Sequence, residues 1–213
     1  MVPTRTSTPI TLTHQTRVLV MRDTARGMVH LHAGLSVGTG NNNGNNGVGL
    51  NMGNGKGGQG RRAGPVIHRD MKTQNLLVDD LVYPRIIKVC DFGLSTSKDR
   101  VRTLTAVGTP QYAAPEVLRS DSYSERADVY SFGVIVWELF QPNGKYPFED
   151  MHALRAAHEV AYSGLRPQPD VPAETPMWVK KLIGSCWASD PQKRPEFKAM
   201  LAIIEREAST HSE

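Results

Sequence analysis

Four polar side chains in two short stretches have the chemistry of a phosphate-handling site. Asp70, Lys72 and Asn75 fall within six residues, and Asp91 follows in the tripeptide DFG. A carboxylate can orient a hydroxyl group and accept its proton, and a lysine ammonium can meet a phosphate as a compact positive charge. Carboxylate and amide oxygens are hard ligands, which suit Mg²⁺. These side-chain types are therefore suited to phosphoryl transfer, which needs positioning and charge neutralisation more than covalent chemistry.

Short strands are expected around these stretches, with helices before and after them. Apolar runs predict strands over 65–68 and 86–90, and residues 75–78 are expected to pair with 86–90 as a hairpin around the turn DDLVYP. Upstream, apolar residues at helical spacing predict a helix over 15–34, with Thr13 as its N-cap and Gly34 as its end. Downstream, the pattern predicts helices over 124–140, 150–162, 175–187 and 195–208.

The stretch SVGTGNNNGNNGVGLNMGNGKGGQG consists mainly of Gly and Asn and has almost no apolar side chains. It cannot bury enough surface to offset the entropy of ordering, so we expect residues 35–63 to be a disordered insert. A Gly-rich phosphate-binding loop would need a strand before it and a helix or strand after it, and neither is visible in the sequence. A genuine insert and an error in the gene model are both compatible with this composition.

Several short motifs occur in a fixed order along the chain. They are HRDMKTQN at 68–75, DFG at 91–93, GTP at 108–110, APE at 114–116, DVYSFG at 128–133 and RP at 194–195. Together they resemble the protein kinase family, and the resemblance covers residues 15–34 and 64–208. The segments GTPQYAAPEVL, SFGVIVWELF and CWASDPQKRP are most similar to the tyrosine-kinase-like branch of serine/threonine kinases.

The resemblance implies an α+β fold, namely the mostly helical C-terminal lobe of the kinase fold with a small β-hairpin region. Residues 15–208 would form this lobe, 1–14 an extended N-terminal remnant and 209–213 a tail. The N-terminal lobe is expected to be absent, because residues 1–14 contain no Lys, Glu or Gly that could clamp the phosphates. We therefore expect this polypeptide by itself to have little or no kinase activity.

The resemblance also assigns catalytic roles. Asp70 matches the aspartate that orients the substrate hydroxyl and accepts its proton, and Lys72 lies where a cation meets the transferred phosphate. Lys72 together with Thr109 indicates serine or threonine as the phosphate acceptor.

A nucleotide site is implied by the same comparison. Lys72, Asn75, Leu77 and Asp91 are expected to bind ATP, and Asn75 and Asp91 to supply the ligands of Mg²⁺. Leu77 is the residue expected under the adenine ring, with a plain core position as the alternative.

Other residues match structural positions of the family. Asp128 is expected to hydrogen-bond the backbone of the catalytic loop, and Glu116 and Arg194 to form a buried ion pair. His68 and Phe92 resemble the lower half of an apolar spine, and Gly93 is expected to give the backbone freedom for the turn after Asp91.

A regulatory role is implied for Arg69, which precedes the catalytic aspartate and would pair with a phosphate on the loop between DFG and APE. We expect Thr103 or Thr105 to carry that phosphate. A merely solvated loop rich in hydroxyl groups is the alternative.

Two functions compete at this point. The chain is either part of an active serine/threonine kinase that binds ATP, Mg²⁺ and a protein substrate, or a non-catalytic binding module that docks partners through its helices. The net charge of +4 is small and no run of five Lys or Arg residues occurs, so no nucleic-acid partner is expected. No stretch is apolar enough for a membrane span, residues 1–13 lack a secretory pattern, and the two cysteines fit a reducing compartment. A cytoplasmic location is therefore expected.

Overall fold

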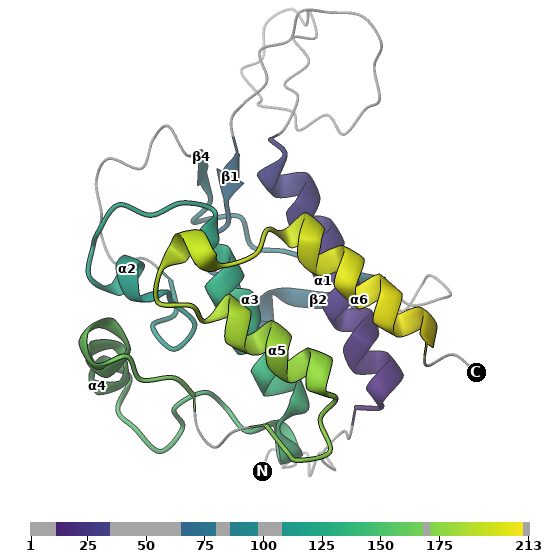
Figure 1. Ribbon diagram of the computed structural model, residues 1–213. Helices are drawn as coiled ribbons and strands as arrows, with labels where there is room; N and C mark the ends of the chain where they lie inside the picture. The colour runs from purple at the N-terminus through teal and green to yellow at the C-terminus, as the bar shows by residue number, and fades with distance from the viewer. Residues whose placement is uncertain (1–11, 35–64, 80–85, 98–107, 168–170, 211–213) are drawn as a thin grey trace, which may run out of the picture.

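A computed structural model describes residues 12–34, 65–79, 86–97, 108–167 and 171–210. Most of these residues are helical, and two small antiparallel sheets lie near the motifs (Figure 1). The fold is therefore the α+β arrangement expected from the sequence. The expected insert at 35–63, most of the expected remnant at 1–14 and the last three residues of the tail lie outside the described residues.

The first helix, α1 (His14–His32), begins at the predicted cap. The hydroxyl of Thr13 accepts a hydrogen bond from the backbone N–H of Thr16 at 3.1 Å, which satisfies one of the free donors of the first turn. The buried face of α1 includes Met21, Ala25 and Met28, at the helical spacing seen in the sequence. This face packs against α6 (Phe197–Thr210), and α1 and α6 run side by side in Figure 1.

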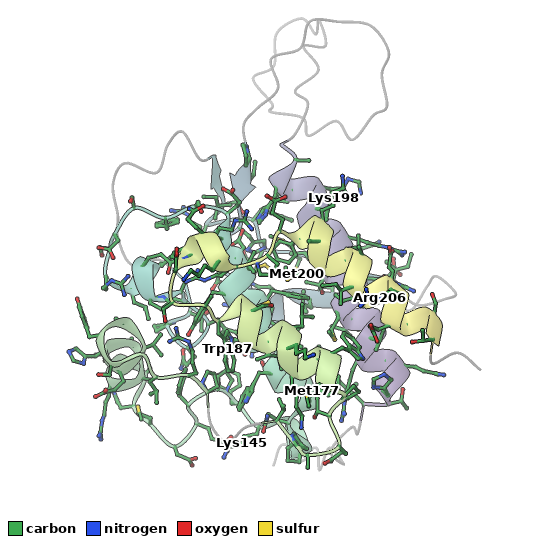
Figure 2. The ribbon with its side chains drawn as sticks, viewed as in Figure 1. Lys145, Met177, Trp187, Lys198, Met200 and Arg206 are labelled. Carbon is green, nitrogen blue, oxygen red and sulfur yellow. The ribbon has the colours of Figure 1, made fainter. Side chains whose placement is uncertain are left out.

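The core helix, α3 (Arg126–Phe140), is buried along nearly its whole length. It packs against α5 (Met177–Cys186) at very close range. A Cβ atom added at Gly133 would lie 2.6 Å from Cys186 Cβ and 2.9 Å from two atoms of the Trp187 ring, so only glycine fits there. Figure 2 shows Met200 of α6 directed toward the interior and Lys198 and Arg206 at the outer edge.

The predicted hairpin is present as β2 (Leu76–Asp79) and β3 (Ile86–Val89), with Leu76 opposite Val89. The predicted strand at 65–68 is β1 (Val66–Ile67), and it pairs with β4 (Thr96–Ser97), which the sequence pattern did not predict. Because β4 has only two residues, it carries no periodicity that could be recognised.

Several elements differ from the predicted boundaries. The helix predicted over 150–162 is α4 (Ala153–His158) followed by the π-helical turn η4 (Glu159–Ser163), and the helix predicted from 195 begins at Phe197. Short turns were not predicted: η1 (Thr73–Asn75), α2 (Pro115–Leu118), η3 (Pro142–Gly144) and η5 (Pro191–Lys193). Each of these has three or four residues, too few for an apolar period to be read.

None of the helices in the described part of the chain combines the length and apolar character that a membrane crossing requires.

Candidate active site

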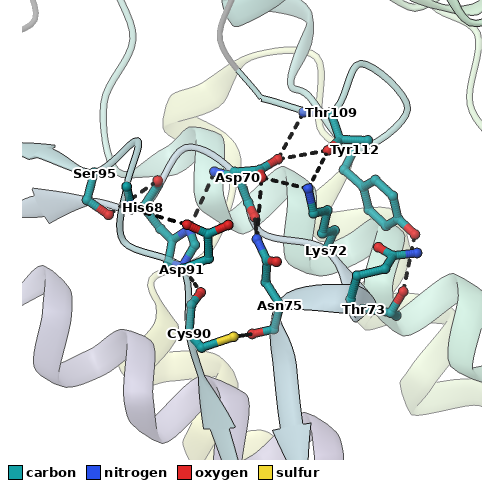
Figure 3. A network of polar contacts seen from close by, with 12 residues as sticks. His68, Asp70, Lys72, Thr73, Asn75, Cys90, Asp91, Ser95, Thr109 and Tyr112 are labelled. Carbon is teal, nitrogen blue, oxygen red and sulfur yellow. Dashed lines mark hydrogen bonds and ion pairs between the residues drawn. The ribbon is translucent and has the colours of Figure 1, made fainter.

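The polar residues of the first two motifs are brought together at the ends of short strands. The loop between β1 and β2 carries Asp70, Lys72 and Asn75, and Asp91 lies two residues beyond the end of β3. Figure 3 shows Asp91 beside Asp70, with Asn75 next to both. Residues separated by up to twenty-one positions therefore face one region.

Asp70, Lys72 and Thr109 form a closed triangle of polar contacts (Figure 3). The Lys72 ammonium donates to Asp70 Oδ2 at 2.7 Å and to Thr109 Oγ1 at 2.9 Å. Asp70 Oδ1 accepts hydrogen bonds from the Thr109 backbone N–H and hydroxyl, both at 2.9 Å. All three predicted catalytic residues therefore lie in contact.

The protonation of Asp70 follows from this geometry. Burial is the largest single effect and by itself raises the pKa of the Asp70 carboxyl, because it disfavours the charged form. Hydrogen bonds from Lys72 and Thr109 and the positive charge of Lys72 outweigh the burial, so the pKa lies below its usual value. Asp70 is therefore ionised at neutral pH and ready to accept a hydrogen bond.

Gly108 allows Thr109 to come this close. Its φ of 109° lies in the region that favours glycine, and an added Cβ would lie 2.6 Å from the Arg69 carbonyl oxygen. A side chain at this position would push Thr109 away from Asp70.

Asn75 and Asp91 present the oxygens that a magnesium ion would need. The Asn75 Nδ2 donates to the Asp70 carbonyl oxygen at 2.8 Å, which fixes the amide and leaves its Oδ1 as an acceptor. Asp91 is exposed. The described residues contain no group of three or more His, Cys, Asp and Glu side chains that could hold a metal. Mg²⁺ usually binds only one or two protein side chains and fills its other coordination positions with water and phosphate oxygens. One amide and one carboxylate fit this preference.

At the turn after β3, the residue with the left-handed backbone is not the one that was expected. We expected Gly93 to provide the backbone freedom, but the left-handed φ, 62°, falls on Asp91 itself. Gly93 contributes space, because an added Cβ there would lie 3.2 Å from Asp91 Oδ1. Its N–H donates to the same oxygen at 3.3 Å.

Asp128 of α3 holds the loop that carries Asp70. Its Oδ2 accepts from the His68 N–H at 2.9 Å, and its Oδ1 accepts from the Arg69 N–H at 3.0 Å. The His32 Nε2 lies 2.8 Å from Asp128 Oδ2. The position of Asp128 therefore agrees with the predicted contact, and His32 is an additional partner that the sequence did not indicate.

His68 and Phe92 lie against each other, with ring centroids 5.1 Å apart. His68 is fully buried, whereas Phe92 is 48% exposed and Leu77 is 54% exposed. The exposure of Leu77 excludes the core position that was its alternative. Leu77 and Phe92 therefore present apolar surface beside the polar site.

Glu116 and Arg194 form a buried bidentate ion pair, with N–O distances of 2.6 and 2.9 Å. The Arg194 guanidinium also lies over the Tyr130 ring at 5.3 Å, and Arg166 lies at the same distance from that ring. This pair connects α2, which contains Glu116, to the residue that follows η5, three positions before α6.

Arg69 donates from its Nε to the Leu94 carbonyl oxygen and from its Nη1 to the Tyr123 hydroxyl at 3.3 Å. Its φ is 71°, an unusual value for a residue with a side chain. The predicted phosphate acceptors Thr103 and Thr105 lie outside the described residues.

Three further residues near the site were missed by sequence reasoning. The Tyr112 hydroxyl donates to Glu138 Oε2 at 2.6 Å, and the Thr73 hydroxyl donates to Glu138 Oε1 at 3.1 Å. The available signal was the charge of Glu138 within the otherwise apolar run SFGVIVWELF. A lone carboxylate on a core helix needs partners.

Comparison with known proteins gives the same assignment. The protein tyrosine and serine/threonine kinase family matches residues 62–204. The chain is 38% identical over 140 residues to the dual specificity protein kinase pyk3 of Dictyostelium discoideum. This alignment covers 66% of this chain and 10% of that protein. It is 41% identical over 144 residues to the probable serine/threonine-protein kinase drkC of the same organism, covering 66% and 18%. It is 36% identical over 147 residues to human mitogen-activated protein kinase kinase kinase 11, covering 66% and 17%.

The chain thus spans between a tenth and a fifth of the length of these three relatives. The family match extends over about two thirds of the chain and includes every motif of the site from HRD to RP. With the described helices and hairpin arranged around Asp70, Asn75 and Asp91, the chain belongs to the protein tyrosine and serine/threonine kinase family.

Proposed function

We propose that this chain is the catalytic, substrate-side part of a protein serine/threonine kinase. The observation that carries the proposal is the triangle of Asp70, Lys72 and Thr109. An ionised carboxylate beside a fixed ammonium can orient a hydroxyl group and lie next to a phosphate at the same time. The pairing of Lys72 with a Thr109 hydroxyl supports serine or threonine over tyrosine as acceptor.

The chemistry proposed for Asp70 is that of an orienting base. A serine or threonine hydroxyl of the substrate donates a hydrogen bond to the Asp70 carboxylate, and its oxygen attacks the γ-phosphorus of ATP. The bond from that phosphorus to the β–γ bridging oxygen breaks, ADP leaves, and the hydroxyl proton passes to Asp70. Because the pKa of Asp70 lies below its usual value, the carboxylate is ionised and can accept the hydrogen bond of the substrate hydroxyl. Lys72 offsets the negative charge that the phosphate brings to Asp70.

Asn75 Oδ1 and the Asp91 carboxylate would hold Mg²⁺, whose charge, when bound, neutralises the phosphate oxygens. The hydrogen bond from Asn75 to the Asp70 carbonyl oxygen prevents the Asn75 amide from rotating. It therefore fixes the distance between this metal ligand and the Asp70 loop. Leu77 would lie under the adenine ring, which its exposure permits.

ATP is expected to bind this polypeptide weakly by itself. Among the described residues, the protein offers the nucleotide one face, made of Asn75, Asp91 and the exposed Leu77 and Phe92. A ligand that buries one side keeps much of its surface in water and gains little affinity.

The test is titration of the full chain with Mg²⁺·ATP, followed by NMR. We expect weak binding, which is lost in Asp91→Asn because a magnesium ligand is removed, and unchanged in Asp150→Asn, where the carboxylate is exposed and distant in sequence from the site. Equal affinity of wild type and Asp91→Asn would contradict the nucleotide site.

Transfer itself is tested with γ-labelled ATP and a mixed protein substrate. We expect this polypeptide by itself to transfer little or no label, and any label transferred should be on serine or threonine. Turnover that Asp70→Asn abolishes would contradict the expected inactivity of the polypeptide alone. Label on tyrosine would refute the acceptor assignment.

A non-catalytic binding module is the second candidate, because Leu77, Val78, Ile86 and Phe92 leave apolar side chains exposed on the hairpin side. Binding of a partner protein that is unaffected by Asp70→Asn, in a chain that binds no Mg²⁺·ATP, would favour it. Either function is proposed to operate in the cytoplasm, where ATP and protein substrates are available.

A further inference from the structure

A hollow lies where α1 ends and where α3 and α6 begin. It is lined by residues within 29–33, 125–129 and 196–198, and its volume is about 290 Å³. Figure 1 shows the end of α1 beside the start of α6. Among the described residues that line the hollow, none belongs to the proposed active site. A volume of this size is at the lower end of the range for ligand pockets and fits a small molecule.

The bottom of the hollow is apolar. Val129 of α3 and Phe197 of α6 are buried, whereas Val29 of α1 is half-buried and Ala33 is exposed, so the last two lie nearer the mouth. The His32 ring meets the Phe197 ring edge to face, with centroids 5.2 Å apart. An aromatic or branched apolar group that enters the hollow is removed from water, which favours binding.

The walls of the hollow are held in place by contacts within the protein. His32 Nε2 lies 2.8 Å from Asp128 Oδ2. The Arg126 guanidinium donates to the Arg194 carbonyl oxygen at 2.7 Å and to Glu196 Oε1 at 3.0 Å. Because these side chains are already ordered, a ligand would bind with little further loss of side-chain entropy.

The charges at the mouth favour an anionic ligand. Arg126 and Glu196 neutralise each other in their ion pair, and Glu125 has a partner of its own. Lys198 is exposed at the outer edge of α6 (Figure 2) and forms no hydrogen bond or ion pair with the residues that the structure describes. Its long flexible stem can bring the ammonium to a carboxylate at the mouth.

We propose that this hollow is a binding site for a small amphipathic carboxylate, which is a molecule with one aromatic or branched apolar group and one carboxylate. The apolar group lies against Val129 and Phe197, and the carboxylate pairs with the Lys198 ammonium. The inference does not rest on the proposed kinase function, because the ligand contacts none of the residues assigned to nucleotide, magnesium or acceptor binding.

The test is an NMR titration of the full chain with 3-phenylpropionate at constant pH and ionic strength, followed at the backbone N–H groups of Ala33 and Phe197. We expect saturable shifts with millimolar affinity, because a ligand of this size makes few contacts. The cation 3-phenylpropylamine, which carries the same ring, should bind more weakly. No saturable shift up to the solubility limit of the carboxylate, or equal affinity for the amine, would overturn the proposal.

Lys198→Met removes the positive charge and keeps most of the length of the side chain. We expect it to weaken the binding of 3-phenylpropionate about two- to fivefold, the range for an exposed ion pair. Lys181→Met is the matched control, because Lys181 is an exposed lysine of α5 that does not line the hollow, and its affinity should equal that of the wild type. Equal weakening in the two variants would contradict the assigned contact with Lys198.

Ala33→Phe places a ring at the mouth of the hollow. We expect it to weaken binding by at least about tenfold, because the ring and the ligand would clash. Ala202→Phe is its control, since Ala202 is an exposed residue of α6 outside the hollow. Exposed positions usually accept such changes without unfolding. Undiminished binding in Ala33→Phe would place the ligand elsewhere and refute the site.

Discussion

At the scale of single residues, the protonation of Asp70 is set by its neighbours. Its pKa is lowered because Lys72 and Thr109 together outweigh the effect of burial. Asp70 and Lys72 could be predicted from the sequence, since a motif places them two positions apart. The contact of Glu138 with Tyr112 and Thr73 could not, because single-sequence reasoning does not show which face of α3 meets the loop.

The lowered pKa of Asp70 predicts a pH-dependent contribution to stability. A carboxyl whose pKa is lower in the folded state stabilises the fold above its unfolded pKa of about 3.9, and this contribution disappears as pH falls through the folded pKa. We therefore expect the difference in unfolding free energy between wild type and Asp70→Asn to be constant from pH 5 to 7 and to shrink below about pH 4. Urea unfolding at several pH values measures this, and a difference that grows on acidification would contradict the assignment.

At the scale of elements, strong local signals were sufficient for α1, α3, α5 and the β2–β3 hairpin. Thr13 caps α1, and the two apolar runs at 75–78 and 86–90 are close enough in sequence to pair as a hairpin. The predicted boundaries of α6 were displaced by two residues, and the division of 150–162 into α4 and η4 was not predicted. Asp190 caps the short turn η5, which ends at Lys193, and α6 begins only at Phe197.

The contact between α3 and α5 gives a prediction at the same scale. Gly133→Ala would place a methyl group 2.6 Å from Cys186 Cβ, so the helices must separate. We expect a loss of roughly 1–3 kcal/mol in unfolding free energy, which is the range for overpacking a core.

Gly184→Ala is the control for this substitution, because no atom lies within 4 Å of a Cβ added at Gly184. It should be neutral or slightly stabilising, since alanine favours helix. Equal effects of the two substitutions would show that α3 and α5 are not in close contact at Gly133.

At the scale of the whole molecule, the buried pair of Glu116 and Arg194 joins segments that are 78 residues apart. We expect Arg194→Met to lower the unfolding free energy by roughly 3–5 kcal/mol, because it leaves the Glu116 carboxylate buried without a partner. Arg206→Met removes an exposed arginine on α6 and should change stability by less than about 1 kcal/mol. Chemical denaturation measures the unfolding free energy of both variants. A similar loss in the two variants would mean that the Glu116–Arg194 pair contributes little to stability.

The left-handed backbone at Arg69 and Asp91 has a consequence for laboratory evolution. Each residue occupies a conformation that glycine adopts more readily, at a strain of order 1 kcal/mol or more. At Arg69 the hydrogen bonds that the side chain donates to Leu94 and Tyr123 oppose a change to glycine. A library randomised at position 91 and screened only for heat resistance should therefore enrich glycine, while the same library screened for nucleotide binding should retain aspartate. The chain would then have given up thermal resistance at position 91 in exchange for a ligand group held at a fixed angle.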